Sequence, residues 1–378
     1  MKIIAGGLDN IPGVRAGGFK EGKYGVALVA FDSVCKAEGV YTTNKMIAPP
    51  LKVTKSKIKN GIQAIVANSG NANCSTGDKG MKDAEEMCRI AAKHLGISQK
   101  NVAVASTGII GRYLDMEAIT DRIGKAYVAL GKNSGAAARA IMTTDTKPKE
   151  LCIDFGSFKI AGIAKGAGMI HPNMATMICL MATDAVFTAG DLKKAVSQSF
   201  NMMSIDNDMS TNDIALIVST GKKKVKGFGA ALTEFCQEMA RMMVADGEGV
   251  TKVIEIEVKG AKTDADARKA ARSIGDSCLV KTAAFGNNPN WGRVAAAAGY
   301  SGAALVESKM KIWYEINGEK VLLFDGFAKA FDRDIWVEKL KGAKEVKIIV
   351  DLGLGTGDAK AWSGDFSYEY VKVNAEYN

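Results

Sequence analysis

The sequence predicts an α/β protein, of the α+β kind, in which helices pack on largely antiparallel sheets as a layered sandwich. Apolar residues make up 47% of the 378 residues, which is enough to bury a large core. Strand-like and helix-like patterns alternate along the chain without an internal repeat. With only 6 prolines, no stretch has the composition of a flexible linker.

The first half of the chain contains short apolar runs with glycine or serine close by, which are typical of strands. These runs are Tyr24–Phe31, Gln63–Ala67, Val102–Ala105, Lys159–Ile163 and Met177–Ala182. A helix is predicted over Lys82–Leu95, because its apolar residues recur every three or four positions and Gly96 follows as a stop signal. Two further helices are predicted, at Asp115–Leu130 and Ser134–Met142.

The second half continues the same mixture. Helices are predicted at Ala189–Met202, Ala230–Val244 and Asp264–Ile274. A strand is predicted at Ile214–Val218, and another at Val253–Val258, where Val and Ile alternate with Glu so that one face meets a core and the other meets solvent. The C-terminal third adds four predicted strands, at Lys311–Ile316, Val321–Phe324, Val346–Leu352 and Phe366–Val373.

Charge and hydropathy exclude some classes of protein. The net charge of +9 is spread along the chain, and its densest cluster, residues 222–226, has no interleaved aromatic residue for stacking on bases. We read that cluster as a solvated loop and expect no nucleic-acid partner. No stretch approaches the roughly 20 apolar residues that span a bilayer, and no signal segment is present, so we expect a cytoplasmic protein with no membrane partner.

Metal and cofactor sites are not expected. The seven cysteines are scattered, and the chain has only two histidines, His94 and His171, so neither a disulfide framework nor a zinc site is indicated. The segment Gly166-Ala167-Gly168 lacks the third glycine of a dinucleotide fingerprint, and no helix start follows it. We therefore predict no metal and no bound cofactor.

A threonine that follows this glycine-rich segment is the candidate nucleophile. A threonine hydroxyl is weak alone, but if the chain is cut just before Thr176, the new α-amine lies beside Oγ and can take its proton. His171 is an alternative base, although a terminal amine makes it unnecessary. Lys165 is a cation that suits a substrate carboxylate, although a lone lysine more often lies at a solvated surface.

Two loops with small polar residues follow strand-like runs, Asn68–Asn73 and Ser106–Gly108. Backbone N–H groups and hydroxyls in such loops converge on an oxyanion in many enzymes. Each loop alone is more often an ordinary turn, so the functional interpretation depends on their occurring together with Thr176.

Taken together, these segments closely resemble the ornithine acetyltransferase family, also called glutamate N-acetyltransferase. The self-cleavage segment of that family is matched by Lys165–Ile170 with Pro172, Ala175 and Thr176. Further family signatures are matched in family order over nearly the whole chain, at Asn68–Asn73, Ser106–Gly111, Met142–Thr146, Ser210–Asp213, Asp246–Gly249, Asn290–Arg293 and Asn374–Tyr377.

The resemblance implies a self-processing enzyme of the N-terminal-nucleophile type. It would cut itself between Ala175 and Thr176 into an α chain of residues 1–175 and a β chain of residues 176–378, and two copies of each would assemble as a heterotetramer. Thr176 would take the acetyl group of N2-acetyl-L-ornithine and pass it to L-glutamate, giving L-ornithine and N-acetyl-L-glutamate in arginine biosynthesis. Acetyl-CoA is an additional acetyl donor in some members, and no residue in this sequence decides its use.

The resemblance also implies roles for individual residues. Thr107 and Gly108 would stabilise the oxyanion. Five residues would lie at the substrate, namely Thr143, Lys165, Thr176, Glu248 and Asn374. Lys165 suits a carboxylate and Glu248 suits the cationic end of ornithine.

Two other functions remain open at this point. A related self-processing amidase or aminopeptidase would use the same threonine and oxyanion loop but pass the acyl group to water. A basic RNA-binding protein without catalysis would bind RNA in a salt-sensitive way.

Overall fold

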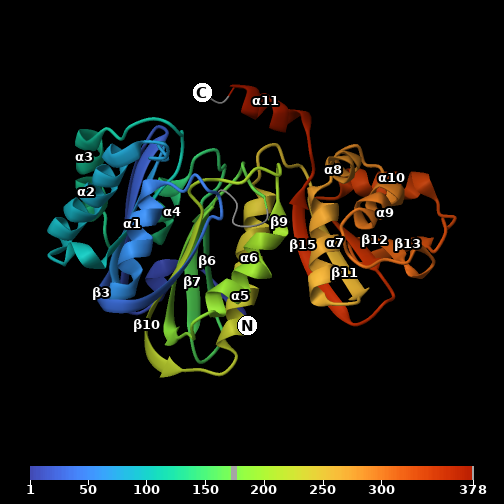
Figure 1. Cartoon of the computed structure of the whole chain (residues 1–378), viewed down its shortest axis with the longest axis horizontal. Helices are drawn as coiled ribbons and strands as arrows, with labels where there is room; N and C mark the ends of the chain where they lie inside the picture. The colour runs from blue at the N-terminus through green and yellow to red at the C-terminus, as the bar shows by residue number, and fades with distance from the viewer. Residues whose placement is uncertain (172–176, 377–378) are drawn as a thin grey trace. The chain divides into compact units, whose positions relative to one another are not determined.

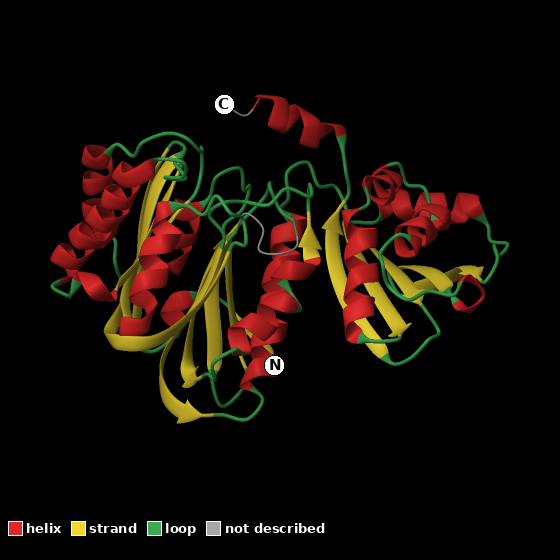
Figure 2. Ribbon diagram, in the orientation of Figure 1, coloured by secondary structure: helices red, strands yellow, loops and turns green. Residues whose placement is uncertain are grey.

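The computed structural model describes residues 1–171 and 177–376, which form two compact units. The first unit contains Met1–Ala167, residues 177–197 and Met209–Met239. The second contains residues 168–171, Gln198–Asp208 and residues 240–376. Figures 1 and 2 show the helices and strands of both units. The predicted chain boundary between 175 and 176 lies outside the described residues and stays a prediction.

The first unit is built on a nine-stranded sheet in the order β1-β6-β7-β8-β10-β3-β4-β5, with β2 paired to β3. Among the described pairings of this sheet, β8 with β10 and β4 with β5 are parallel, and the rest are antiparallel. The predicted α/β class with largely antiparallel sheets is thereby confirmed. The strands are β1 (Lys2–Ile4), β2 (Val14–Glu21), β3 (Tyr24–Tyr41), β4 (Ile62–Ser69), β5 (Val102–Ser106), β6 (Lys149–Asp154), β7 (Lys159–Lys165), β8 (Ile178–Val186) and β10 (Ile214–Lys224).

Helices cover this sheet because its strands are apolar on both faces. Along β3, Val26 and Leu28 belong to a buried cluster with residues of α2 and α3, whereas Ala27 and Val29 belong to a second cluster with residues of α4. This division follows from the two-residue repeat of a strand. The helices that begin in this unit are α1 (Pro49–Lys57), α2 (Gly77–Leu95), α3 (Met116–Val128), α4 (Ser134–Ile141), α5 (Asp191–Ser197) and α6 (Phe228–Ala245).

The second unit contains a six-stranded sheet in the order β13-β12-β14-β11-β15-β9. Its strands are β9 (Met203–Ser204), β11 (Val253–Ala261), β12 (Lys311–Ile316), β13 (Glu319–Asp325), β14 (Glu345–Asp351) and β15 (Gly357–Gly364). Its helices are α7 (Asp264–Asp276), α8 (Cys278–Phe285), α9 (Trp291–Gly299), α10 (Arg333–Gly342) and α11 (Tyr368–Glu376). The predicted apolar face of β11 is confirmed, since Ile254, Ile256 and Val258 are fully buried.

The sequence predictions fail in three places. The predicted strand Phe366–Val373 is wrong, because α11 covers most of it and the Ser367 hydroxyl accepts the N–H of Tyr370 at 3.4 Å, as a helix cap does. The predicted helix Ala189–Met202 is shorter, since α5 ends at Ser197 and a single 3-10 turn follows at Phe200–Met202. The basic cluster is not wholly a loop, because its first three residues belong to β10.

Within the described residues, no helix combines the length with the apolar content that crossing a bilayer requires. All seven cysteines are free thiols, and six of them are buried. The predicted cytoplasmic location stays a prediction.

Candidate active site

The two polar loops predicted to stabilise an oxyanion pack against each other in the first unit. Thr107 directly follows β5 and is buried, and its N–H donates to the carbonyl of Asn68 at 3.0 Å. Beyond it, the N–H of Ala72 donates to the carbonyl of Ile109 at 3.0 Å. The pairing continues β4 and β5 beyond the sheet, so it fixes the backbone on both sides of Gly108.

Gly108 occupies a position that requires glycine. Its φ of +128° lies in a region that other L-residues rarely adopt. A Cβ atom here would lie 2.5 Å from the backbone nitrogen of Asn71 and would overlap the backbone of Gly70. The close approach of the two loops therefore depends on the absence of a side chain at residue 108.

A third signature segment ties these loops to the strand that follows the predicted cleavage site. The Asn212 side-chain amide donates to the carbonyls of Ala72 and Ser106, at 2.7 and 2.9 Å. Next to it, Asp213 Oδ1 accepts the N–H of Met177 at 3.0 Å. Burial raises the pKa of the Asp213 carboxyl well above its usual range, although the hydrogen bond that it accepts from Met177 opposes the shift.

Ala175 and Thr176, the predicted cleavage pair, lie outside the described residues. Met177 is the next residue along the chain, and its N–H is fixed by Asp213 in the same unit as the paired loops. The structure thus describes both the oxyanion loops and the residue that follows the predicted nucleophile.

Thr143 and the residue after Lys165 are bound by the same carboxylate, that of Asp145, which the sequence did not single out. Asp145 Oδ2 accepts the N–H of Thr143 at 3.0 Å, and Asp145 Oδ1 accepts the N–H of Gly166 at 2.8 Å. Lys149 forms a fully buried ion pair with Asp145, with 2.7 Å between Nζ and Oδ1. Asp145 therefore connects the turn that carries Thr143 to the end of β7, where Lys165 lies buried.

The charges around Asp145 leave this region positive. Burial by itself would raise the pKa of Asp145, but Lys165 and Lys149 outweigh it and lower the pKa to about 2. Lys20 also faces the cluster, and its pKa is lowered by burial and by Lys165 although Asp145 opposes the shift. Three lysines thus interact electrostatically with one carboxylate, an arrangement that suits an anionic ligand.

We expect Asp145→Asn to lower the free energy of unfolding by about 3 kcal/mol at pH 7, because it leaves buried lysines without their anion. The folded-state pKa of Asp145 is depressed, so its stabilising contribution is present above the unfolded pKa of about 4 and is lost as pH falls towards 2. Urea unfolding of both proteins from pH 7 to pH 3 measures this. The difference between them should shrink on acidification, and a constant difference would show that the ionised carboxylate is not the cause.

Glu248 and Asn374, the other predicted substrate residues, lie together in the second unit. Asn374 is on α11, and its side-chain amide donates to Glu248 Oε2 at 2.8 Å. Gly168 is close to the same carboxylate, because a Cβ atom on Gly168 would overlap all of the Glu248 carboxyl group. The carboxylate of Glu248 thus lies between α11 and the segment that precedes the predicted cleavage site.

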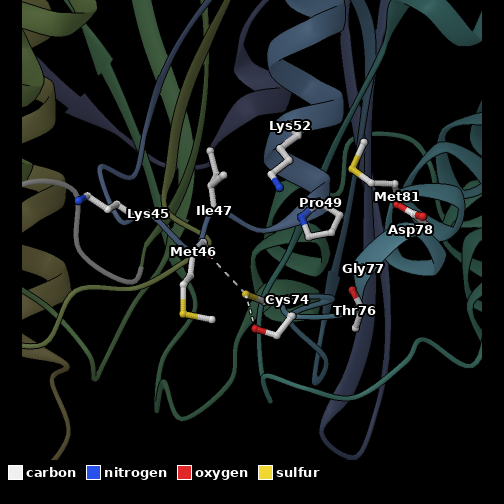
Figure 3. Close-up of a pocket in the computed structure, with 11 residues that line it drawn as sticks. Lys45, Met46, Ile47, Pro49, Lys52, Cys74, Thr76, Gly77, Asp78 and Met81 are labelled. Carbon is white, nitrogen blue, oxygen red and sulfur yellow. Dashed lines mark hydrogen bonds between the residues drawn. The ribbon is translucent and has the colours of Figure 1, made fainter.

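The cavities in the first unit do not coincide with these residues. A cavity of about 300 Å³ is lined by segments 45–52 and 74–81, with Lys52, Met46 and Cys74 among the residues drawn in Figure 3. Another, of about 230 Å³, is lined in part by Asn68 and Asn71. Neither cavity is lined by a predicted catalytic or substrate residue that the structure describes. The position of the substrate is therefore argued from hydrogen bonds and charges.

Sequence reasoning missed Asp145 and Asp213. Both stand inside signature segments, Met142–Thr146 and Ser210–Asp213, that were recognised only as matches to a family. A carboxylate in a turn of small polar residues is a signal for backbone N–H binding. Lys149 is only four residues from Asp145, but Lys20 and Lys165 come from strands that are distant along the chain, and no local pattern reveals them.

Comparison with known proteins agrees with the resemblance drawn from the motifs. The ArgJ family model matches residues 11–378. A glutamate N-acetyltransferase from Methanocaldococcus jannaschii is 46% identical, with 100% of each chain covered. The arginine biosynthesis bifunctional protein ArgJ from Archaeoglobus fulgidus is 44% identical, over 98% of this chain and 99% of the relative.

Two solved structures also match parts of the chain. The crystal structure of the arginine biosynthesis bifunctional protein ArgJ from Bacillus halodurans is 36% identical and covers 51% of this chain and 96% of its own, with a TM-score of 0.46. The ornithine acetyltransferase from Mycobacterium tuberculosis, solved in complex with ornithine, is 28% identical and covers 47% and 99%, with a TM-score of 0.44. From the family match over nearly all of its residues and the identity to full-length relatives, the chain belongs to the ArgJ family.

Proposed function

We propose that this enzyme transfers an acetyl group from N2-acetyl-L-ornithine to L-glutamate in arginine biosynthesis, through an acetyl ester on Thr176. Membership of the ArgJ family supports the reaction, and full-length relatives carry the name glutamate N-acetyltransferase. One observation supports assigning the reaction to this site. The Asn212 amide links three of the signature segments, and the neighbouring Asp213 binds Met177, the residue that follows Thr176.

The nucleophile is released by self-cleavage. Thr176 Oγ attacks the carbonyl carbon of Ala175, the peptide C–N bond breaks, and the acyl group moves to oxygen as an ester. Water then hydrolyses the ester and frees the α chain. The new α-amine of Thr176, with an ordinary pKa of about 8, accepts the hydroxyl proton in each later attack.

The acetyl transfer has two half-reactions with the same geometry. Thr176 attacks the acetyl carbonyl and ornithine leaves, after which the glutamate amine attacks the ester and regenerates the hydroxyl. Thr107 and Gly108 stabilise the oxyanion in both, Thr107 through its hydroxyl because its N–H already binds the carbonyl of Asn68. The positive region at Lys165 and Thr143 receives the carboxylate that both substrates share, and Glu248 with Asn374 receives the ornithine side chain.

The assembled enzyme contains two α chains and two β chains and acts in the cytoplasm without a metal or bound cofactor. Free cysteines support a reducing compartment. Some relatives are described as bifunctional, so acetyl-CoA is a second acetyl donor to be tested.

The acyl acceptor is the point to test, because a self-processing amidase would use the same nucleophile. With acetylornithine as donor, we expect acetyl-glutamate to form at least about 100-fold faster than free acetate, with the parallel reciprocal plots of a ping-pong reaction. Mass spectrometry of the products measures both. Acetate release that is unaffected by glutamate would favour the amidase, and replacing acetylornithine with acetyl-CoA in the same assay decides bifunctionality.

A further inference from the structure

The segment just before the predicted cleavage site is held by one side chain of the second unit. Asp206 Oδ2 accepts the N–H of Met169 at 2.6 Å, and Asp206 Oδ1 accepts the N–H of Ile170 at 2.8 Å. In return, the carbonyl of Ile170 accepts the N–H of Ile205 at 2.8 Å. Both oxygens of one carboxylate therefore bind consecutive residues of the segment 168–171.

The backbone of this segment is in an unfavourable conformation. Met169 has a φ of +56°, in the left-handed region that residues with a Cβ rarely adopt. Its side chain is partly exposed, whereas Ile170 is fully buried and anchors the next residue. The exposed Met169 side chain does not favour this conformation. We therefore attribute the conformation to the hydrogen bonds that Asp206 accepts from Met169 and Ile170.

Asp206 also lies near the helix that carries a predicted substrate residue. Burial raises the pKa of Tyr370 on α11, and the nearby Asp206 carboxylate adds to the shift. The same helix carries Asn374, which binds Glu248, and Glu248 lies against Gly168. The segment 168–171 therefore has a neighbour on each side, Asp206 at Met169 and Ile170 and Glu248 at Gly168.

We propose that Asp206 is a positioning residue for self-cleavage, which holds the segment 168–171 in its left-handed turn so that the peptide bond before Thr176 is presented for attack. This inference rests on the proposed self-cleavage. Asp206 does not touch the reacting atoms. It acts through the backbone of Met169 and Ile170, and its Oδ1 also accepts the N–H of Asp208 at 3.2 Å, which orients the carboxylate.

The test follows cleavage of the full-length precursor over time by intact mass, in the wild type and in Asp206→Asn. Asparagine has one acceptor oxygen and places an NH₂ group against a backbone N–H, so it keeps at most one of the two bonds. We expect cleavage to slow at least about 10-fold. Asp208→Asn, at the exposed neighbouring carboxylate, is the matched control and should cleave at the wild-type rate.

A suppressor separates positioning from general damage. Glycine adopts a positive φ without strain, so Met169→Gly added to Asp206→Asn should restore cleavage to within about threefold of wild type. If Asp206 only stabilised the fold, replacing Met169 with glycine would not restore the cleavage rate. If Asp206→Asn does not fold, Asp206→Glu, which keeps the charge and shifts both oxygens, is expected to slow cleavage in the same way and to be rescued by Met169→Gly.

The outcomes are distinct. A wild-type chain that stays uncut would overturn the proposed self-cleavage itself. A wild type that is cut, with an Asp206 variant that is cut equally fast or a slow variant that Met169→Gly fails to rescue, would overturn the positioning role and leave the proposed function standing.

Discussion

Thr176→Ala is expected to leave the chain uncut and to lower acetyl transfer by at least about 10⁴-fold, because it removes the nucleophile of both self-cleavage and catalysis. In the wild type, denaturing gels and intact mass should show two fragments that meet between Ala175 and Thr176. The variant should run as one full-length chain, and incubation with acetylornithine should add an acetyl group only to the wild-type β chain.

A matched control distinguishes loss of the nucleophile from loss of a threonine in general. Thr188 is exposed and follows β8, so Thr188→Ala should be cut and active at wild-type rates. If Thr176→Ala were cut at the same bond, or if it retained acetyl transfer within tenfold of wild type, the mechanism built on Thr176 would have to be abandoned.

Gly108→Ala is expected to lower acetyl transfer about 10²- to 10³-fold, the size of effect that follows loss of an oxyanion donor. The added Cβ overlaps Gly70 and crowds Asn71, so the loop of Thr107 must move away from the loop of Asn68. The loss should appear mainly in kcat, because the oxyanion forms in the transition state and not in the bound substrate. Steady-state kinetics with both substrates measures it.

Gly111→Ala provides the control for backbone strain in the same loop. Its φ is +83°, so alanine is unfavourable there too, but a Cβ would meet nothing within 4 Å. We expect a loss of about 1 kcal/mol in the free energy of unfolding with kcat within a few-fold of wild type. Equal losses of kcat in the two variants would mean that loop strain, and not displacement of the oxyanion donors, is responsible.

The elements that could be predicted from the sequence are those whose pattern and environment agree. The helix α2 was found from its apolar spacing and from Gly96, which takes the left-handed cap conformation. The strand β11 was found from alternation, although Glu255 is buried where solvent was expected, because Trp362 donates to it and Lys347 and Lys360 lie close by. Local pattern succeeds where one face meets a core.

The failures have a common cause in contacts that are distant along the chain. Alternating Tyr, Glu and Val residues at the C-terminus resemble a strand, yet among the described residues no strand pairs with them, and the Ser367 hydroxyl caps α11. The candidate site shows the same division. Thr107 and Gly108 could be placed after a strand from sequence, whereas Lys20 and Lys165 approach Asp145 only when β2 and β7 are folded.

The order of strands in the nine-stranded sheet determines what a cut before Thr176 would leave behind. Strands β8 and β10, which would belong to the β chain, lie between β7 and β3 of the α chain, so among the described pairings of this sheet β7 and β3 are connected through strands of the other polypeptide. The two products would therefore stay together in the first unit after the covalent link is gone. Unfolding would then separate more molecules for the mature enzyme than for the uncut precursor, so the melting temperature of the mature enzyme would rise more steeply with its concentration.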